Sequence, residues 1–186
     1  MINATDAQTP RATIRSKDSG KYRILIAYAT RCGSTAEVAQ AVGDVLREAG
    51  AEVDVHPVDA VTDVSPYQAA IVGTAIRVGT CLPETKRFVE THRKALGSIP
   101  VVLFCVCLAV KETDPEQRQP VEEYLAPLRE IVSPVQEGHF AGVMEYTKLP
   151  FFTRLMIQMM NLDQGDFRDW DAIRAWAQEV YPLLSG

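Results

Sequence analysis

Apolar runs that alternate with helical patterns are the feature that most constrains this chain. Residues 22–29, YRILIAYA, form a nearly continuous apolar run, which is typical of a parallel strand covered on both faces. Strands are predicted at 22–29, 51–59, 67–74, 99–110 and 139–144, and helices at 34–48, 84–96, 120–132 and 169–184. The order β-α-β-β-α-β-α-β-α predicts an α/β fold, with a parallel sheet between two layers of helices.

Length and charge limit the classes of protein that fit. The 186 residues suit one domain, which we expect at 21–186 after a flexible N-terminal tail at 1–20. A net charge of -5 disfavours nucleic acid as a partner, because phosphate contacts need clustered Lys and Arg. No apolar run reaches the roughly 18 residues of a membrane span, and the first residues lack the apolar core of a secretory signal. We therefore expect a cytoplasmic protein.

A short polar loop joins the first predicted strand to the first predicted helix. It consists of Thr30, Arg31, Cys32, Gly33, Ser34 and Thr35. A helix N-terminus offers unpaired N–H groups and a partial positive charge, and hydroxyl groups add donors. The loop therefore predicts a phosphate site without a lysine; the alternative is that Ser34 or Thr35 simply caps the helix. The motifs G-x-G-x-x-G and G-x-x-x-x-G-K-[ST] are absent here, which disfavours NAD and nucleoside triphosphates.

The same loop resembles the phosphate motif T/S-x-T-G-x-T of the flavodoxin family, with Cys32 in place of the usual threonine. The resemblance extends from about residue 22 over nearly the whole chain. It implies a flavodoxin-like three-layer α-β-α sandwich, a five-stranded parallel sheet in the order 2-1-3-4-5, and non-covalently bound FMN. The phosphate is expected on 30–35 and the flavin ring between the loops at 74–80 and 107–111. The ring-binding residues that the resemblance implies are Thr74, Ala75, Ile76, Arg77, Val78, Gly79, Cys107, Leu108 and Ala109.

Within that family, the chain is similar to the menaquinone-dependent protoporphyrinogen oxidases. The similarity rests on the stretch G-T-A-I-R-V-G at 73–79, a strand that runs into the charged stretch 111–119, the segment 146–160, and a last helix with the pattern W-x-x-I-x-x-W-A. It implies an FMN-dependent oxidoreductase of heme biosynthesis that takes hydrogen from protoporphyrinogen IX and passes electrons to a quinone. The alternatives are a flavodoxin-type electron-transfer protein that docks on redox partner proteins, and an FMN-binding regulatory domain without turnover.

The composition of the two ring loops helps to separate these alternatives. Neither loop contains Trp, Tyr or Phe, whereas electron-carrying flavodoxins typically enclose the ring between aromatic side chains. A cation such as Arg77 beside the ring would stabilise the negative charge of the reduced flavin and raise its potential. Arg77 is therefore the candidate catalytic residue and a candidate partner for a substrate carboxylate. The alternative is that Arg77 is a surface arginine or forms an ion pair with Glu84.

The four cysteines do not predict a metal site. No C-x-x-C pair occurs, and the residues that could complete a zinc site are few. Cys105 and Cys107 share one face of a predicted strand. Cys32, Cys81 and Cys107 fall near the expected ring, where we interpret them as small side chains that fill space. A redox-active thiol is the alternative, but the sequence shows no resolving partner.

The segment 147–161, TKLPFFTRLMIQMMN, repeats Phe, Leu and Met at helical spacing. Such a helix can pack on the sheet, or it can present an apolar face to a quinone, a macrocycle or a membrane surface. The sequence thus leaves open a peripheral contact with the inner face of the cell membrane through 147–161.

Overall fold

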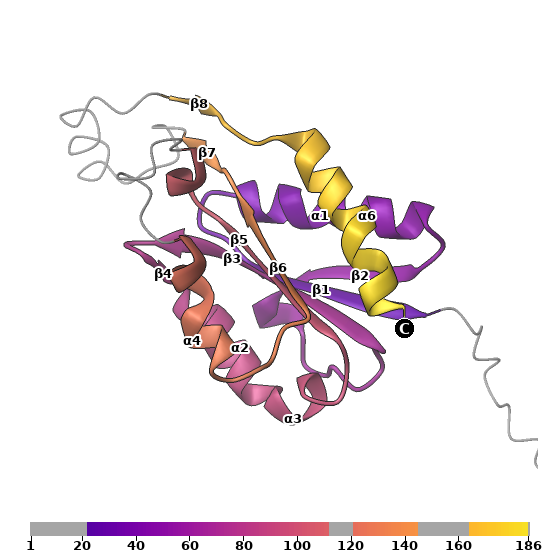
Figure 1. The fold of residues 1–186 in the computed structure, drawn as a ribbon. Helices are drawn as coiled ribbons and strands as arrows, with labels where there is room; N and C mark the ends of the chain where they lie inside the picture. Colours follow the sequence, from indigo (N-terminus) through magenta and orange to yellow (C-terminus); the bar gives the residue numbers. More distant parts are fainter. Residues whose placement is uncertain (1–21, 112–120, 145–163, 186) are drawn as a thin grey trace, which may run out of the picture.

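Five parallel strands form the centre of the computed structural model, which describes residues 22–111, 121–144 and 164–185 (Figure 1). The parallel strands are β1 (Arg23–Ala29), β2 (Glu52–Pro57), β3 (Ala69–Arg77), β5 (Val101–Val106) and β6 (Gln136–Phe140). Their order across the sheet is β2-β1-β3-β5-β6. When these strands are counted along the chain, this is the predicted order 2-1-3-4-5.

Helices cover both faces of the sheet (Figure 1). The long helices α1 (Ser34–Glu48) and α6 (Trp170–Leu184) cover one face, and α2 (Pro83–Thr91), α3 (Arg93–Leu96) and α4 (Ala126–Arg129) cover the other. The described residues also contain the short 3-10 helices η1 (Val58–Ala60), η2 (Leu108–Lys111) and η3 (Val121–Leu125). The predicted three-layer α-β-α architecture is confirmed.

Because successive side chains of each strand point to opposite faces of the sheet, the buried residues form two separate cores. In β1, Ile24 and Ile26 face α1 and α6, whereas Leu25 and Ala27 face the layer of α2 and α4. All four residues are fully buried. Successive side chains of a strand point to opposite faces, so a continuous apolar run is what a sheet with two covered faces requires.

At the carboxyl edge of the sheet, two strands end at residues other than those predicted. The strand predicted at 67–74 continues to Arg77 and turns back into β4 (Thr80–Cys81), which pairs antiparallel with it. The turn residues Val78 and Gly79 both have positive φ angles, 51° and 73°. A two-residue turn of this kind matches the twist of a hairpin and favours glycine. The strand predicted at 99–110 ends instead at 106, because the chain then enters η2.

Three other predicted elements are divided in the structure. The helix expected at 84–96 breaks at His92, whose φ and ψ are -98° and 13°. The helix expected at 120–132 consists of η3 and α4, with Pro127 in the first turn of α4, where a proline costs no helical hydrogen bond. The strand expected at 139–144 is split between β6 and β7 (Val143–Met144). Strand β7 pairs antiparallel with β8 (Gly165–Asp166).

Some predictions fall on residues that the structure does not describe. The tail at 1–20, nearly all of the charged loop 111–120 and the whole segment 147–161 lie outside the described residues. Among the described residues, none of the helices has both the length and the apolar character needed to cross a bilayer.

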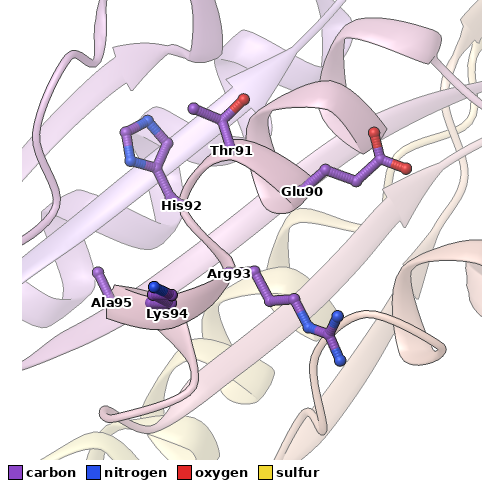
Figure 2. Close-up of a pocket in the computed structure, with 6 residues that line it drawn as sticks. All are labelled: Glu90, Thr91, His92, Arg93, Lys94 and Ala95. Carbon is purple, nitrogen blue, oxygen red and sulfur yellow. The ribbon is translucent and has the colours of Figure 1, made fainter.

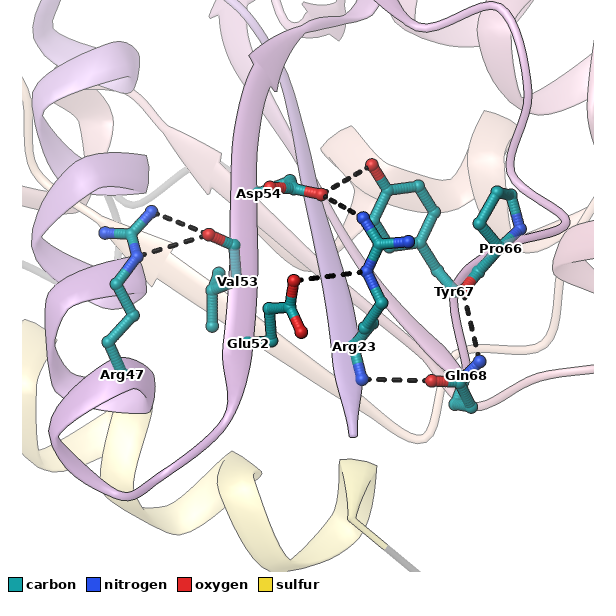
Figure 3. Close-up of polar contacts among 8 residues, drawn as sticks. All are labelled: Arg23, Arg47, Glu52, Val53, Asp54, Pro66, Tyr67 and Gln68. Carbon is teal, nitrogen blue, oxygen red and sulfur yellow. Dashed lines mark hydrogen bonds and ion pairs between the residues drawn. The ribbon is translucent and has the colours of Figure 1, made fainter. Parts of the chain in front are cut away.

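A polar network fastens the strands at the amino edge of the sheet (Figure 3). Asp54 accepts hydrogen bonds from the Tyr67 hydroxyl at 2.9 Å and from Nη2 of Arg23 at 3.0 Å. The Arg23 guanidinium also lies 5.2 Å from the centre of the Tyr67 ring. Burial raises the pKa of Tyr67 to about 12, and the hydrogen bond to Asp54 acts in the same direction. These contacts link β1 and β2 to the residues just before β3, so we interpret them as structural.

We expect Gly73→Ala to destabilise the fold strongly. A Cβ on Gly73 would lie 2.1 Å from the ring of Phe104, which is fully buried and packs against Phe140 and Trp176. Overpacking of this kind costs about 3 kcal/mol of unfolding free energy, measurable by urea denaturation. Because Phe104→Leu would vacate the space, the double variant should be less destabilised than the sum of the single variants. Additive effects would contradict the steric explanation.

Candidate functional site

The carboxyl ends of the parallel strands bring several loops together. A Cβ built on Gly142, which follows β6, would lie 3.8 Å from Oγ of Ser34 and 3.2 Å from Val106 of β5. A Cβ built on Gly79 would lie 3.7 Å from the ring of Tyr124. Segments that follow β1, β3, β5 and β6 therefore meet at one edge, where ligands bind in open α/β sheets.

The loop 30–33 leads directly into the N-terminus of α1. Gly33 is the N-cap, with a φ of 95°, and no side chain caps the helix. The N–H of Gly33 donates to Oγ1 of Thr30 at 3.0 Å, which holds the loop in a tight bend. The alternative in which Ser34 or Thr35 caps the helix is therefore wrong. Within the described residues, the N–H groups of 34–36 have no hydrogen-bond partner.

Thr35 carries the most informative side chain of this loop. It is fully buried, and its hydroxyl has no hydrogen-bond partner among the described residues. An unsatisfied buried hydroxyl costs about 1–3 kcal/mol, so such a group usually serves a ligand or an ordered water. The hydroxyl, the unpaired N–H groups and the helix dipole make a donor set that fits a phosphate group.

The first predicted ring loop is a hairpin rather than an irregular loop. Thr74 is fully buried inside β3, and its hydroxyl accepts hydrogen bonds from the N–H of Leu82 at 3.1 Å and from the hydroxyl of Thr85 at 3.0 Å. It also donates to the carbonyl of Ala75 at 3.0 Å. The side chain of Thr74 therefore fastens the hairpin to the start of α2.

The hairpin exposes its tip. Ala75 and Ile76 are half-buried, whereas Arg77, Val78 and Gly79 are exposed. Val78 is 95% exposed and has a positive φ, an uncommon combination for a β-branched residue. The tip thus presents an apolar group and a guanidinium side by side.

Glu84 pairs with Arg31, not with Arg77. The guanidinium of Arg31 donates two hydrogen bonds to the Glu84 carboxylate, from Nη1 to Oε1 and from Nη2 to Oε2, the second at 3.0 Å. This pair links the loop 30–33 to the first turn of α2. Arg77 forms no ion pair within the part of the chain that the structure describes. The alternative in which Arg77 is neutralised by Glu84 is therefore wrong.

The second predicted ring loop is a 3-10 turn after β5. Cys107 is buried, and its N–H donates to the carbonyl of Phe140 at 3.0 Å. Leu108 is half-buried, and Ala109 lies within η2. Sequence analysis did not identify Tyr124, which lies next to Gly79 and is separated from both ring loops in the sequence.

The cysteines are thiols rather than disulfides, and most of them are buried. Cys81, Cys105 and Cys107 are buried, Cys32 is half-buried, and none of the four forms a disulfide. A hydrogen bond to the Cys107 thiol and burial both raise the pKa of Cys105, and burial raises the pKa of Cys81. Both effects favour the protonated thiol over the reactive thiolate. Within the described residues, no group of three or more His, Cys, Asp or Glu side chains is arranged to hold a metal ion.

Another group of charged side chains lies beside the first turn of α1, and sequence analysis did not identify it. Glu37 of α1 forms an ion pair of 2.7 Å with Arg168, which is also paired with Asp166 of β8 at 2.6 Å. Glu37 and Arg168 are 131 residues apart. No local sequence pattern could connect residues at that separation.

A hollow on the surface lies elsewhere, where α2 ends and α3 begins (Figure 2). Its volume is about 520 Å³, and it is lined by Glu90, Thr91, His92, Arg93, Lys94 and Ala95. Helix α3 precedes the amino end of β5, so the hollow lies at the opposite edge of the sheet from the loop 30–35. It contains none of the predicted site residues.

The Arg31–Glu84 pair predicts a pH-dependent contribution to stability. Burial alone would raise the pKa of Glu84, but the hydrogen bond from Arg31, a backbone hydrogen bond and the charges of Arg31 and Arg87 together hold this pKa below its ordinary value. A lowered pKa in the folded state contributes stability above the pKa of the unfolded chain, and this stability is lost as the pH falls through the folded pKa. Because Arg31 is half exposed, we expect Glu84→Gln to cost only about 1 kcal/mol at pH 7.

The measurement is urea denaturation of wild type and Glu84→Gln at several pH values. Their difference in unfolding free energy should shrink as the pH falls below the ordinary range of a glutamate. Glu48→Gln, at an exposed position of α1, is the matched control and should show no such change. A difference that stays constant with pH would show that ionisation of Glu84 does not contribute.

Comparison with known proteins agrees with this architecture. The flavodoxin domain family matches residues 25–171. Protoporphyrinogen IX dehydrogenase [quinone] of Escherichia coli strain K12 is 26% identical over 175 residues, which cover 87% of this chain and 96% of that protein. A protein of the same name from Leishmania major is 26% identical over 131 residues, covering 64% of this chain and 56% of its own length.

Solved structures show the same fold. A flavodoxin from the domain Archaea has a TM-score of 0.55 at 13% identity, covering 88% of this chain and 99% of its own. A Streptococcus pneumoniae TIGR4 flavodoxin has a TM-score of 0.55 at 18% identity, covering 87% of this chain and 99% of its own. At these identities the similarity concerns the fold alone. Together with the match over 25–171, the parallel sheet and the loop at its carboxyl edge identify the chain as a member of the flavodoxin domain family, which binds FMN.

Proposed function

We propose that the loop 30–35 binds the phosphate of FMN and that the flavin ring lies between the hairpin 74–80 and the turn 107–111. The buried hydroxyl of Thr35 and the unpaired N–H groups at the start of α1 support the phosphate position. The loop's one cation, Arg31, is already paired with Glu84, so neutral donors would hold the phosphate. When bound, FMN supplies the ability to accept and pass on electrons. The protein supplies binding, orientation and the local charge.

The chain, in our proposal, is an FMN-dependent oxidoreductase of the protoporphyrinogen IX dehydrogenase type, which passes electrons to a quinone. The observation that carries this proposal is the similarity to the Escherichia coli enzyme over 96% of that enzyme's length. The two ring loops themselves contain no Trp, Tyr or Phe, which also favours it, because electron-carrying flavodoxins typically enclose the flavin ring between aromatic side chains of these loops. An electron-transfer protein that docks on redox partners is the competing function.

Arg77 is the side chain that we assign to substrate binding. It is exposed at the tip of the hairpin and forms no ion pair among the described residues. The next residue, Val78, is apolar and almost completely exposed. A guanidinium binds a carboxylate through two parallel hydrogen bonds, and an apolar neighbour suits the body of a macrocycle. This pairing matches a substrate that carries carboxylates on an apolar ring system.

Thr35→Val tests the phosphate site. Valine keeps the shape of threonine and removes a hydroxyl that has no described partner, so the stability without FMN should stay equal or rise slightly. The Kd for FMN, measured by flavin fluorescence quenching, should rise about tenfold because a hydrogen bond to a charged group is lost. Thr85→Val is the matched control, since its hydroxyl is hydrogen-bonded and its removal should destabilise the protein by about 1 kcal/mol. Unchanged FMN affinity in Thr35→Val would contradict the phosphate position.

An anaerobic visible spectrum tests the proposed reaction. The FMN-loaded protein should lose its yellow absorbance when protoporphyrinogen IX is added, and a menaquinone analogue should restore it. Replacing Arg77 by Gln should raise the porphyrinogen concentration needed for half-maximal bleaching by about tenfold, because a charge-assisted pair is lost. Arg93→Gln, which removes an equal charge from the hollow at the other edge of the sheet, should leave that concentration unchanged.

Three outcomes separate the competing functions. A bound flavin that ignores protoporphyrinogen IX but exchanges electrons with a redox protein would favour the electron carrier. Stable reduction without any acceptor would favour a regulatory FMN-binding domain. A protein that binds no FMN would contradict the site itself.

A further inference from the structure

Three charged side chains from two distant parts of the chain meet beside the first turn of α1. Nη1 of Arg168 lies 2.7 Å from Oε2 of Glu37, and Nη2 lies 2.6 Å from Oδ2 of Asp166. The segment that carries Arg168 is close to the loop 30–35, because Phe167 donates a backbone hydrogen bond to Gly142 at 3.2 Å. A Cβ on Gly142 would in turn lie 3.8 Å from Oγ of Ser34.

Glu37 is placed where a bound phosphate would be affected by its charge. A Cβ built on Gly33 would lie 3.9 Å from Oε1 of Glu37, so the carboxylate borders the N-cap of α1. In the first turn of a helix, a carboxylate is stabilised by the helix dipole, as an anionic ligand is. The phosphate of FMN and an unpaired Glu37 would therefore compete for the same positive potential and repel each other.

Arg168 is held between Glu37 and Asp166, so its one positive charge offsets part of the charge of both carboxylates. Its side chain is only 7% exposed, although Glu37 and Asp166 are 54% and 44% exposed. Asp166 fixes it further through Nε at 2.8 Å and through the backbone N–H at 3.1 Å. The guanidinium also lies 4.4 Å from the centre of the Trp170 ring. The hydrogen bond to Asp166, followed by that to Glu37, raises the pKa of Arg168, so its charge persists.

We propose that Arg168 is a positioning residue for phosphate binding: it neutralises and orients Glu37, so that the loop 30–35 can accept a dianionic phosphate without repulsion from that carboxylate. The inference rests on the proposed binding of FMN at this loop. It assigns Arg168 no contact with the cofactor. Its consequence is selectivity for the phosphorylated flavin, because riboflavin has no phosphate and is not sensitive to the charge of Glu37.

The test compares the Kd values for FMN and for riboflavin in each variant, measured by fluorescence quenching at low salt. In Arg168→Gln, the preference for FMN over riboflavin should fall about tenfold, since Glu37 is then uncompensated. In Glu37→Gln, the preference should equal or exceed that of wild type. The double variant, with both residues replaced by Gln, should recover most of the lost preference.

Additional variants separate electrostatics from folding. Arg168→Lys keeps the charge and should retain most of the preference for FMN. Arg174→Gln removes an exposed cation of α6 that is paired with Asp171 at 3.4 Å, and it should leave the preference unchanged. A purely structural role would weaken the binding of both flavins equally and leave their ratio constant. High salt should reduce the effect of Arg168→Gln, because the Glu37 carboxylate is half exposed.

Distinct results would overturn the two proposals. If wild type prefers FMN and Arg168→Gln keeps that preference, the role of Arg168 is excluded while the FMN site stands. If the double variant does not recover the preference, Glu37 is not the group through which Arg168 acts. If wild type binds neither flavin, or binds both equally, the phosphate site itself is excluded and the role of Arg168 with it.

Discussion

The burial of β1 on both faces and on both edges is the constraint on which the rest of the structure depends. Strand β1 pairs in parallel with β2 on one side and with β3 on the other, and residues 24–27 are fully buried. Parallel neighbours require crossover connections. Helix α1 connects β1 to β2, and η1 with the segment after it connects β2 to β3. The strand order changes direction at β1, so the loop that leaves its carboxyl end lies at a topological switch point. The position of the loop 30–35 follows from this topology.

The charged side chains described around that loop are held in ion pairs. Arg31 is bound by Glu84, and Arg168 lies between Glu37 and Asp166. Both arrangements connect the start of α1 or the preceding loop to a segment that comes much later in the chain. Among the described residues of the loop 30–35 and the start of α1, the groups that remain available to an anion include neutral donors, namely the N–H groups at the start of α1 and the hydroxyl of Thr35. Such a site can select a phosphate by geometry, with little net charge of its own.

The two loops that we propose to enclose the flavin ring are anchored in different ways. The hairpin 74–80 is fastened at its base by Thr74, which joins β3 to the start of α2 through two hydrogen bonds that it accepts. Its tip at Val78 is exposed, and the positive φ angles of Val78 and Gly79 match the twist of a hairpin. The turn after β5 is anchored by the backbone bond from Cys107 to Phe140. A rigid base and an exposed tip are what a site needs if it must hold a cofactor and still meet a second molecule. The proposed oxidoreductase would use both.

The sequence alone determined the class of the fold and the succession of strand, polar loop and helix at residues 22–48, and its resemblance to flavodoxins supplied the strand order. The fold class and the succession of elements were predicted correctly because apolar periodicity reports burial directly. The bounds of α1 were predicted at 34–48, as observed, since the apolar spacing and Gly50 mark both ends. The strand ends at 77 and 106 were predicted less well, because hairpin pairing with β4 and the 3-10 turn η2 set them.

The partners of the charged residues were decided only by the tertiary structure. Glu84 bonds to Arg31 and not to Arg77, and Arg168 meets Glu37 across 131 residues of chain. The unpartnered hydroxyl of Thr35 was visible in the sequence as a threonine, but its burial was not. Ion pairs between distant residues produce no periodic pattern in the sequence. A charged side chain at the surface can pair with many different residues, and only the fold determines which of them lies close to it. The sequence therefore determined which loop joins β1 to α1, and the fold decided which charges surround that loop.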